Sequence, residues 1–559
     1  MKTTPIAQAA ALLILATTLA ACGGGGSTPS SGGNEPPPTE NPPPADNGDF
    51  SLLLSTDKAL VIQGHTVQLT ATLTRRNGFS GAVQVALQNL PAGASAASVV
   101  IAEGATSARI TLSAAASAPH SLPTAVRALG SAGTKTASAP LTVTVGGLPG
   151  AIDTSFQGGA QFVSPGEGED YAAALAVQPD GKVLSVGWTS TAAGGTDLAL
   201  VRHGRDGVLD AGFGSGGKVV TGFAASGGAD QAYAVALQRD GKILVGGSTA
   251  TSGTDLDFLL VRYHADGRLD TSFGQGGKVV TSFGTSTDRI NAILVQDDGK
   301  IVVGGESDQG STTTGIDFAL ARYNTDGSLD AGFGNAGKVL TPVRSQSARD
   351  SIYAMTWQQV GNQKRIVAVG GEGDFAAVRY LADGQLDGGF GSGGKVGALF
   401  GSTIGAARAV LATPQGQLVL AGSSMNDVAL ARLNADGTLD AGFGTGGRVI
   451  TALAADNWDA ATALVRQADG KLIVGGWVYE GAGSAGNFAL LRYSGDGAAD
   501  ATFGSAGRVV TPVAAPMQRD AGRALALQAD DRISTVRVLQ AGEASKDGGY
   551  QFALLRYWL

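Results

Sequence analysis

The sequence predicts an all-β protein, and three observations carry that prediction. Glycine supplies 86 of the 559 residues, roughly twice its usual share, which is typical of short strands joined by tight turns. Long stretches alternate apolar and polar residues with the period of two expected of half-buried strands. One strand-rich unit of about 60 residues recurs from residue 150 onward, which indicates a repeat architecture.

The composition is that of a globular protein, with 43% hydrophobic and 15% charged residues. The net charge of -8 and the pI near 5.1 come without clusters of Lys and Arg, so nucleic acid is not an expected partner. The single cysteine, Cys22, excludes an intrachain disulfide.

Residues 1–21 have the layout of a secretory signal peptide, with a basic start, an apolar run too short to span a membrane, and small residues. The LAAC stretch at residues 19–22 resembles the lipobox of bacterial lipoproteins, which implies cleavage before Cys22 and lipid attachment to it. Gly23 resembles the residue found in the outer-membrane sorting class. We therefore expect an outer-membrane lipoprotein of the bacterial cell envelope; the alternative is an ordinary signal with an incidental cysteine.

Residues 22–49 contain Gly, Ser and two Pro-Pro-Pro runs, and no apolar residue able to enter a core, which predicts an extended tether. Residues 50–146 then show period-two alternation over a length that suits a β-sandwich. The segments GFSGAVQVALQNLPAGASA and ITLSAAASAPHSLPTAVRALG resemble bacterial immunoglobulin-like domains. That resemblance implies a spacer, and a binding module is the alternative.

The remainder repeats a stretch exemplified by LDAGFGSGGKVV. Its aspartate recurs at Asp153, Asp210, Asp270, Asp330, Asp387, Asp440 and Asp500, in steps of 57, 60, 60, 57, 53 and 60 residues. Each copy continues into an alternating strand, an Asp-Gly turn, a second strand, a variable loop and a third strand such as DFLLVRY. Asp-Gly between two such strands indicates a hairpin, and GKVV adds a fourth strand.

Four antiparallel strands with a period near 60 are typical of a β-propeller blade, so residues 150–559 predict a seven-bladed β-propeller. The copies, with their LDxxFGxxGKV, PDGK and DFALxRY motifs, resemble the delta-60 repeat family, which implies a propeller and mostly lacks an assigned function. The first copy opens with the fourth-strand motif and the last copy lacks it. We therefore expect Gly159–Val163 to pair with Tyr550–Tyr557 and close the ring.

The glycines of this repeat also match the G-x-G-x-x-G pattern of nucleotide sites, at Gly212, Gly214 and Gly217. Such a loop binds phosphate only where a helix follows it, because the N-terminal N–H groups of that helix point at the anion. The sequence predicts a strand there. The glycines are therefore interpreted as turns between strands, and no cofactor is expected.

No catalytic or metal site is predicted. The four histidines are scattered without metal-ligand spacing, and no serine lies in a G-x-S-x-G context.

Polar residues recur at three positions of the repeat: the aspartate of L-D, an arginine ending the third strand, and an aspartate before the first strand. The arginines are Arg202, Arg262, Arg322, Arg379, Arg432, Arg492 and Arg556, and the second aspartates are Asp170, Asp230, Asp288, Asp350, Asp459 and Asp520. A residue that every blade needs is structural, so we expect Asp–Arg pairs and turn bonds. The alternative is an aspartate ring that binds a cation at the channel mouth.

Four aromatic residues define the candidate binding face. Trp188 and Trp477 end second strands, Trp458 lies in a loop between blades, and Tyr479 is close by, so all four should reach one face. On that face the loops EGD and SSMND of the fourth and fifth copies are short and should leave a notch, whereas Trp357 should lie in the core. Exposed Trp and Tyr suit stacking on a sugar or anchoring a protein; the alternative is that each ring covers its own blade.

These observations favour a monomeric lipoprotein whose propeller is a non-catalytic binding or interaction module for an extracellular glycan or protein. The alternative is a propeller enzyme, a glycan hydrolase or lyase that acts on an extracellular polymer. A mixed cluster of Asp, Glu, Tyr and His that is unique to one or two blades and converges on the channel would favour the enzyme, whereas an aromatic face poor in carboxylates would favour binding.

Replacement of Cys22 by Ser should move the protein from the membrane fraction to the soluble fraction, because no other residue can carry the lipid. Incorporation of labelled palmitate measures this directly. Equal labelling of the variant and the natural protein would contradict the lipobox interpretation.

Overall fold

The computed structural model describes residues 49–559 except 225–226, 253–254, 285, 310–314, 344–348, 454–457, 480–485, 514–519, 533–534 and 547. The predicted lipid-attachment residue Cys22, the signal peptide and nearly all of the tether lie outside these residues. Within the described part of the chain, no helix is long and apolar enough to cross a membrane.

The first part of the described chain folds into two sheets around one apolar core. Its strands are β1 (Phe50–Leu54), β2 (Lys58–Ile62), β3 (Thr66–Arg75), β4 (Val83–Gln88), β5 (Ala94–Ala96), β6 (Val99–Ile101), β7 (Ser107–Ala114), β8 (Thr124–Ala132) and β9 (Lys135–Gly146). The sheet orders are β1-β3-β7-β5 and β2-β9-β8-β4-β6. Alternate residues of both sheets, such as Leu69, Leu73 and Val85, point into the shared core, as the period-two pattern predicts.

The repeats fold into four-stranded antiparallel sheets, numbered here 1 to 7 in chain order. Sheet 1 holds β11 (Asp170–Val177), β12 (Val183–Ser190), β13 (Thr196–His203) and β14 (Lys218–Thr221). Sheet 2 holds β15 (Asp230–Leu237), β16 (Ile243–Ser252), β17 (Asp255–Tyr263) and β18 (Lys278–Thr281). Sheet 3 holds β19 (Asp288–Val295), β20 (Ile301–Asp308), β21 (Ile316–Tyr323) and β22 (Lys338–Thr341).

The later copies repeat this order. Sheet 4 holds β23 (Ile352–Val360), β24 (Gln363–Gly370), β25 (Ala376–Tyr380) and β26 (Lys395–Val396). Sheet 5 holds β27 (Gly405–Ala412), β28 (Leu418–Ser424), β29 (Asp427–Leu433) and β30 (Arg448–Thr451). Sheet 6 holds β31 (Asp459–Arg466), β32 (Leu472–Tyr479), β33 (Gly486–Tyr493) and β34 (Arg508–Thr511). Sheet 7 holds β35 (Asp520–Asp530), β36 (Thr535–Lys546), β37 (Gly549–Trp558) and β10 (Ala160–Val163).

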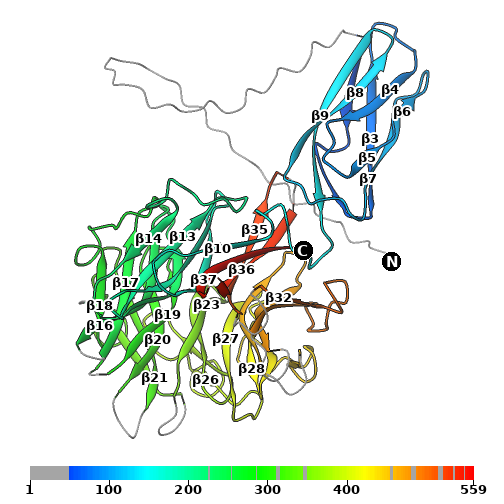
Figure 1. Cartoon of the computed structure of the whole chain (residues 1–559). Coiled ribbons are helices and arrows are strands. Elements are labelled where there is room, and N and C mark those ends of the chain that lie inside the picture. Colours follow the sequence, from blue (N-terminus) through cyan, green and yellow to red (C-terminus); the bar gives the residue numbers. More distant parts are fainter. Residues whose placement is uncertain are drawn as a thin grey trace, which may run out of the picture. The chain divides into compact units, whose positions relative to one another are not determined.

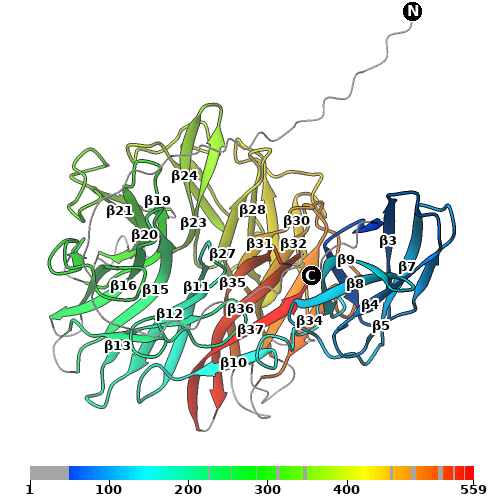
Figure 2. The same ribbon diagram turned by 90° about the horizontal axis from the view of Figure 1, so that it is seen from above.

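The sheets form a closed circuit, the arrangement of a β-propeller. The first strand of each sheet contacts the first strand of the next, and β11 of sheet 1 also contacts β35 of sheet 7. Figures 1 and 2 show the strands succeeding one another around the circuit, with cyan β10 beside red β37. The apolar clusters lie between successive sheets, as in the group that joins Leu244 of sheet 2 to Ile301 of sheet 3.

Sheet 7 is completed by a strand from the other end of the repeat region. Strand β10 pairs antiparallel with β37, from Ala160 opposite Leu555 to Val163 opposite Phe552. This confirms the pairing expected of the first fourth-strand motif. Because sheet 7 contains strands from both ends, the circuit cannot open without breaking a ladder.

The glycine-rich stretch of each repeat is a turn, as expected. Gly214 and Gly217 have φ values of 53° and 94°, a region that residues with a Cβ rarely adopt, and strand β14 follows them directly. The stretch therefore offers no helix N-terminus for a phosphate.

The repeated arginine and the aspartate of L-D pair in all seven copies. The Nε to Oδ2 distances lie between 2.7 and 2.9 Å for Arg202–Asp210, Arg262–Asp270, Arg322–Asp330, Arg379–Asp387, Arg432–Asp440, Arg492–Asp500 and Arg556–Asp153. Each guanidinium also lies over the buried phenylalanine three residues after its aspartate, 4.3 to 4.8 Å from the ring centroid. The structural expectation for these two positions is confirmed.

The same arginines connect neighbouring sheets. Arg262 Nη1 of sheet 2 donates to the carbonyl of Thr325, 2.6 Å away in the Asp-Gly turn of sheet 3. Arg556 of sheet 7 donates in the same way to Arg205 O of sheet 1, at 2.8 Å. In six of the seven copies the arginine therefore links its own sheet to the turn of the next one, and one such bond spans the closure.

The aspartates that precede the first strands do not pair with these arginines. They are buried, and four of them bind backbone amides of the preceding loop, as when Asp230 accepts from Ala224 N and Asp288 from Phe283 N. Among the described residues no three His, Cys, Asp or Glu gather as metal ligands would. The aspartates hold the loops that enter each sheet, and the expected pairing with arginine does not extend to them.

Replacement of Arg262 by Ala should lower the free energy of unfolding by about 3–5 kcal/mol, because it leaves Asp270, whose side chain is only 3% exposed, without its cation. Arg322→Ala should cost less, since Lys300 remains 2.8 Å from Asp330. Denaturant titration measures both, with Arg239→Ala as the control: its pair with Asp297 is exposed and should contribute no more than about 1 kcal/mol. Equal stability of all three variants would show that the buried pairs are not stabilising.

Stability should also fall at low pH. Burial by itself raises the pKa of Asp270, but bonds from Ser272 and the charge of Arg262 outweigh it and hold the pKa below 3.8. A lowered folded-state pKa adds stability above the unfolded value, and that stability is lost as pH falls through the folded pKa. The free energy of unfolding should therefore decline below about pH 4, with a shallower decline in Arg262→Ala; parallel curves for the two proteins would contradict this.

Candidate functional site

A β-bulge in the first strand of every sheet builds the candidate site. The pairing register slips by one residue at the same point in all seven first strands. A bulge leaves one residue unpaired and redirects its side chain. The seven bulged residues, called the bulge ring, are Ala173, Tyr233, Asn291, Tyr353, Arg408, Thr462 and Arg523. All seven line one cavity of about 430 Å³, the first cavity.

The bulge ring varies where its surroundings do not. The residue that follows the bulge is alanine in all seven strands, from Ala174 in β11 to Ala524 in β35. The ring itself contains Ala, Tyr, Asn, Thr and Arg. A constant backbone therefore presents one side chain from each sheet, of five types in all, to the same space.

A second layer comes from the second strands. Each carries a glycine opposite the first strand, and a Cβ at Gly187 would lie 1.8 Å from Tyr171 O, so only glycine allows this approach. The next residue faces the cavities. Trp188 and Glu543 at this position line the first cavity, and Glu306, Ser423 and Trp477 line its neighbour.

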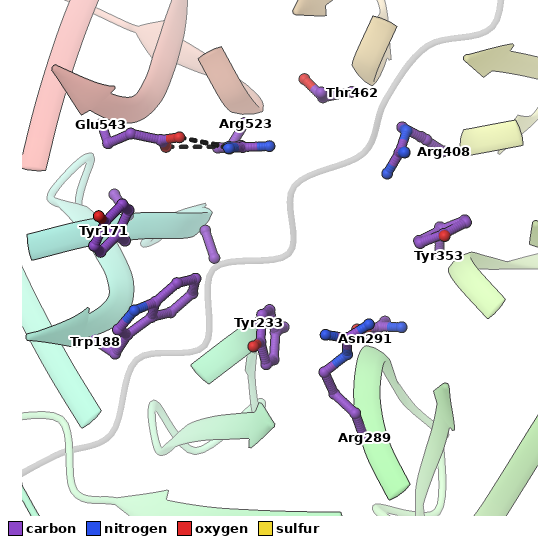
Figure 3. Close-up of a pocket in the computed structure, with 12 residues that line it drawn as sticks. Tyr171, Trp188, Tyr233, Arg289, Asn291, Tyr353, Arg408, Thr462, Arg523 and Glu543 are labelled. Carbon is purple, nitrogen blue, oxygen red and sulfur yellow. Dashed lines mark hydrogen bonds and ion pairs between the residues drawn. The ribbon is translucent and has the colours of Figure 1, made fainter. Parts of the chain in front are cut away.

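Aromatic rings form one wall of the first cavity. Tyr171 and Trp188 stack with ring centroids 5.4 Å apart and planes 18° apart, and Tyr233 lies 5.2 Å from Trp188. Figure 3 shows these three rings grouped on one side of the space that the bulge ring surrounds. Burial raises the pKa of Tyr171 and of Tyr233, so both hydroxyls stay protonated at neutral pH.

Three arginines contribute charge to the first cavity, and two of them are neutralised. Arg289 pairs with Glu306 at 2.5 Å, and Arg523 binds both carboxylate oxygens of Glu543, with Nε 3.0 and 3.1 Å from them. Arg408 forms no ion pair with a described residue. Its guanidinium lies 4.7 Å from the ring centroid of Tyr353, a cation–π contact.

A second cavity of about 400 Å³ adjoins the first, and Arg289, Tyr353 and Arg408 line both. Its floor includes the short loops of sheets 4 and 5, with Glu372 and Asn426 among the lining residues. The notch expected over these short loops is therefore present.

The structure places three of the four predicted aromatic residues in the linings of the two cavities. Trp188 lines the first; Trp477 and Trp458, the latter 60% exposed, line the second. Tyr479 lines neither cavity, and its ring packs against Trp477 at 5.0 Å. Trp357 is partly buried against the core, as expected.

The residues that the sequence interpretation missed are the bulge ring and its neighbours, above all Tyr233, Tyr353 and Arg408. A signal for them exists in the sequence. The reference point is the aspartate that precedes each first strand, which is Gly405 in the fifth copy. The third residue after it varies among the copies, whereas the fourth is always alanine. Only knowledge of the bulge shows that this variable position faces a cavity.

The fold and the cavity define the class: a β-propeller with its variable residues at the centre of one face. Five segments match the model of a family described as a domain of unknown function (DUF5122) beta-propeller, at residues 178–213, 238–273, 296–333, 413–443 and 467–503. These segments are β-propeller repeats. They contain the Arg–Asp pairs of their sheets, and every residue of the bulge ring lies outside them.

No curated protein matches the chain. The solved structures found are remote. They include the tail fibre of Staphylococcus aureus phage P68 (9% identity, 48% of this chain and 50% of that one, TM-score 0.25) and prolyl oligopeptidase B from Galerina marginata (11% identity, 76% and 54%, TM-score 0.31). A third is a DUF4784 family protein from Bacteroides caccae (11% identity, 83% and 98%, TM-score 0.21). The chain spans about half the length of the first two.

Proposed function

We propose that the protein is a cell-envelope lipoprotein whose seven sheets are the blades of a propeller that binds an extracellular glycan without catalysis. In this proposal the two sheets of residues 50–146 are an immunoglobulin-like spacer, and Cys22 anchors a monomer in the outer membrane. The lipobox resemblance at residues 19–22 and the delta-60 resemblance of the repeats support this assignment.

The single observation that carries the proposal is the variable bulge ring on a constant scaffold. A residue kept in every sheet maintains the fold, as the Arg–Asp pairs do. In the bulge ring the residue type changes from sheet to sheet, and all seven side chains line one cavity. A set of dissimilar side chains around one concave space is the pattern of a ligand site.

The cavity favours a glycan over a protein partner. Its volume of about 430 Å³ lies in the range of small-ligand sites, and it is concave, whereas protein interfaces bury far larger and flatter areas. The Tyr171, Trp188 and Tyr233 rings offer flat apolar area bordered by hydroxyl and amide groups. Sugar rings have apolar faces and polar edges that complement such a wall.

The alternative of a glycan hydrolase has less support. Hydrolysis of a glycosidic bond needs one carboxyl group that carries a proton and a second that is ionised. Four of the described acidic residues line the two cavities. Glu543 and Glu306 are paired with arginines, Glu372 lies 3.6 Å from Arg349, and Asp459 accepts a hydrogen bond from Leu453 N. Each therefore has a cation or an N–H donor beside it, an arrangement that does not favour the protonated carboxyl group that hydrolysis requires.

The test is a glycan array probed with the protein, followed by titration of the best ligand. Trp188→Ala should lower affinity by about 2 kcal/mol, roughly thirtyfold, because it removes the central ring of the aromatic wall. Trp357→Ala is the matched control, since that ring lines a different cavity. Equal losses in both variants, or release of shortened glycan during the assay, would overturn the proposed binding role.

A further inference from the structure

We interpret the two cavities as one extended site with the arginines Arg289 and Arg408 at its centre. Arg289, Tyr353 and Arg408 belong to both linings, so the two cavities adjoin at these three side chains. Trp188 lies in the first cavity, and Trp458 and Trp477 lie in the second. Aromatic surface is therefore available on both sides of the shared residues.

Among the described residues shared by both linings, Arg408 is the charged group without a carboxylate partner. Glu306 neutralises Arg289, and Glu543 neutralises Arg523, while the exposed guanidinium of Arg408 meets only the ring of Tyr353. Stacking on a ring face orients the guanidinium plane and leaves its N–H groups available to an acceptor. A planar fork of donors matches a carboxylate, which can accept two parallel bonds.

We propose that the occupant is an acidic oligosaccharide, with the carboxylate of a uronic acid residue bound to Arg408 and further sugar rings in the two cavities. This inference rests on the proposed glycan-binding function and gives it a substrate class. One ring stacks on the Trp188 wall, and the chain continues across Tyr353 towards Trp477 and Trp458. Each cavity by itself has the volume of a small-ligand site, so a single sugar leaves half of the site empty.

The chemistry of the site also separates this occupant from a neutral chain. A neutral sugar gains the stacking contacts but leaves the charge of Arg408 without a partner. A uronate gains the same stacking contacts, and its carboxylate also accepts a charge-assisted hydrogen bond from Arg408. Such bonds contribute roughly twice what a neutral hydrogen bond does. Affinity should therefore depend on the carboxylate and on chain length as two separable contributions.

The experiment is calorimetric titration of the mature protein with uronic acid oligomers of one to six units, drawn from galacturonate, mannuronate and glucuronate series, and with their methyl esters. The ester keeps the ring and removes the charge. We expect at least one acidic series to bind, with affinity that rises beyond one unit and then levels off, and at least about a tenfold loss on esterification.

Substitutions at two residues, Arg408 and Trp477, separate the contributions of charge and chain length. Arg408→Gln should bring the affinity for the acid down to that for its ester, and Arg408→Lys should restore part of it. Trp477→Ala should weaken the long oligomers and leave the shortest ligand unchanged. Arg239→Gln, which removes an exposed arginine outside both cavities, should change nothing, and matching melting temperatures show that each variant is folded.

Acid and ester binding equally, or a glycan array that yields only neutral ligands, would overturn the inference and leave glycan binding in place. Binding that does not change with chain length would equally overturn the two-cavity occupant. An array that yields no glycan at all would overturn the proposed function itself.

Discussion

The structure depends on one buried ion pair, repeated in each sheet, between the arginine that ends the third strand and the aspartate of L-D. The pair does three things at once. It neutralises a charge that could not otherwise be buried, it leaves Nη1 free to bind the turn of the next sheet, and it places the guanidinium over a buried phenylalanine. Removing one partner of such a pair leaves an uncompensated buried charge, which costs about 3–5 kcal/mol of folding free energy.

Glycine completes this junction. The turn glycine of each sheet packs on the phenylalanine of the sheet before it, and a Cβ at Gly267 would lie 2.9 Å from the Phe213 ring. Gly267 also has a φ of 88°, so both its backbone and its surroundings require glycine. The spacing between sheets is thus fixed at their periphery by the pair, the ring and the turn together. The first strands near the centre do not contain this pair, and they carry the bulge ring.

That separation explains which features the sequence predicts. Strands, Asp-Gly turns and the pairing of β10 with β37 follow from local patterns and from the need to complete a sheet. The partners of polar residues are harder to predict. The repeated pattern identifies Arg262 and Asp270 as structural, but it does not separate them from Asp230, whose partners are loop amides. Sequence spacing gives no measure of which carboxylate a folded arginine meets.

The bulge ring escapes prediction for a different physical reason. Alternation with a period of two assigns every strand residue to one face or the other, and a bulge interrupts this alternation by one residue. Tyr233 and Arg408 therefore look like ordinary strand residues in the sequence. Trp188 could be predicted, since it lies near the end of a second strand, on the side of a propeller where the loops open.

The bulge ring lies apart from the junctions that the Arg–Asp pairs build. Its side chains line the first cavity, and two of them, Asn291 and Thr462, also donate to carbonyl groups of the next sheet, Ile352 O and Gly522 O. The segments that match the repeat family contain the residues that build the junctions and omit the ring. Likeness in those segments is therefore evidence of fold, and the residues that distinguish the cavity of this chain lie outside them.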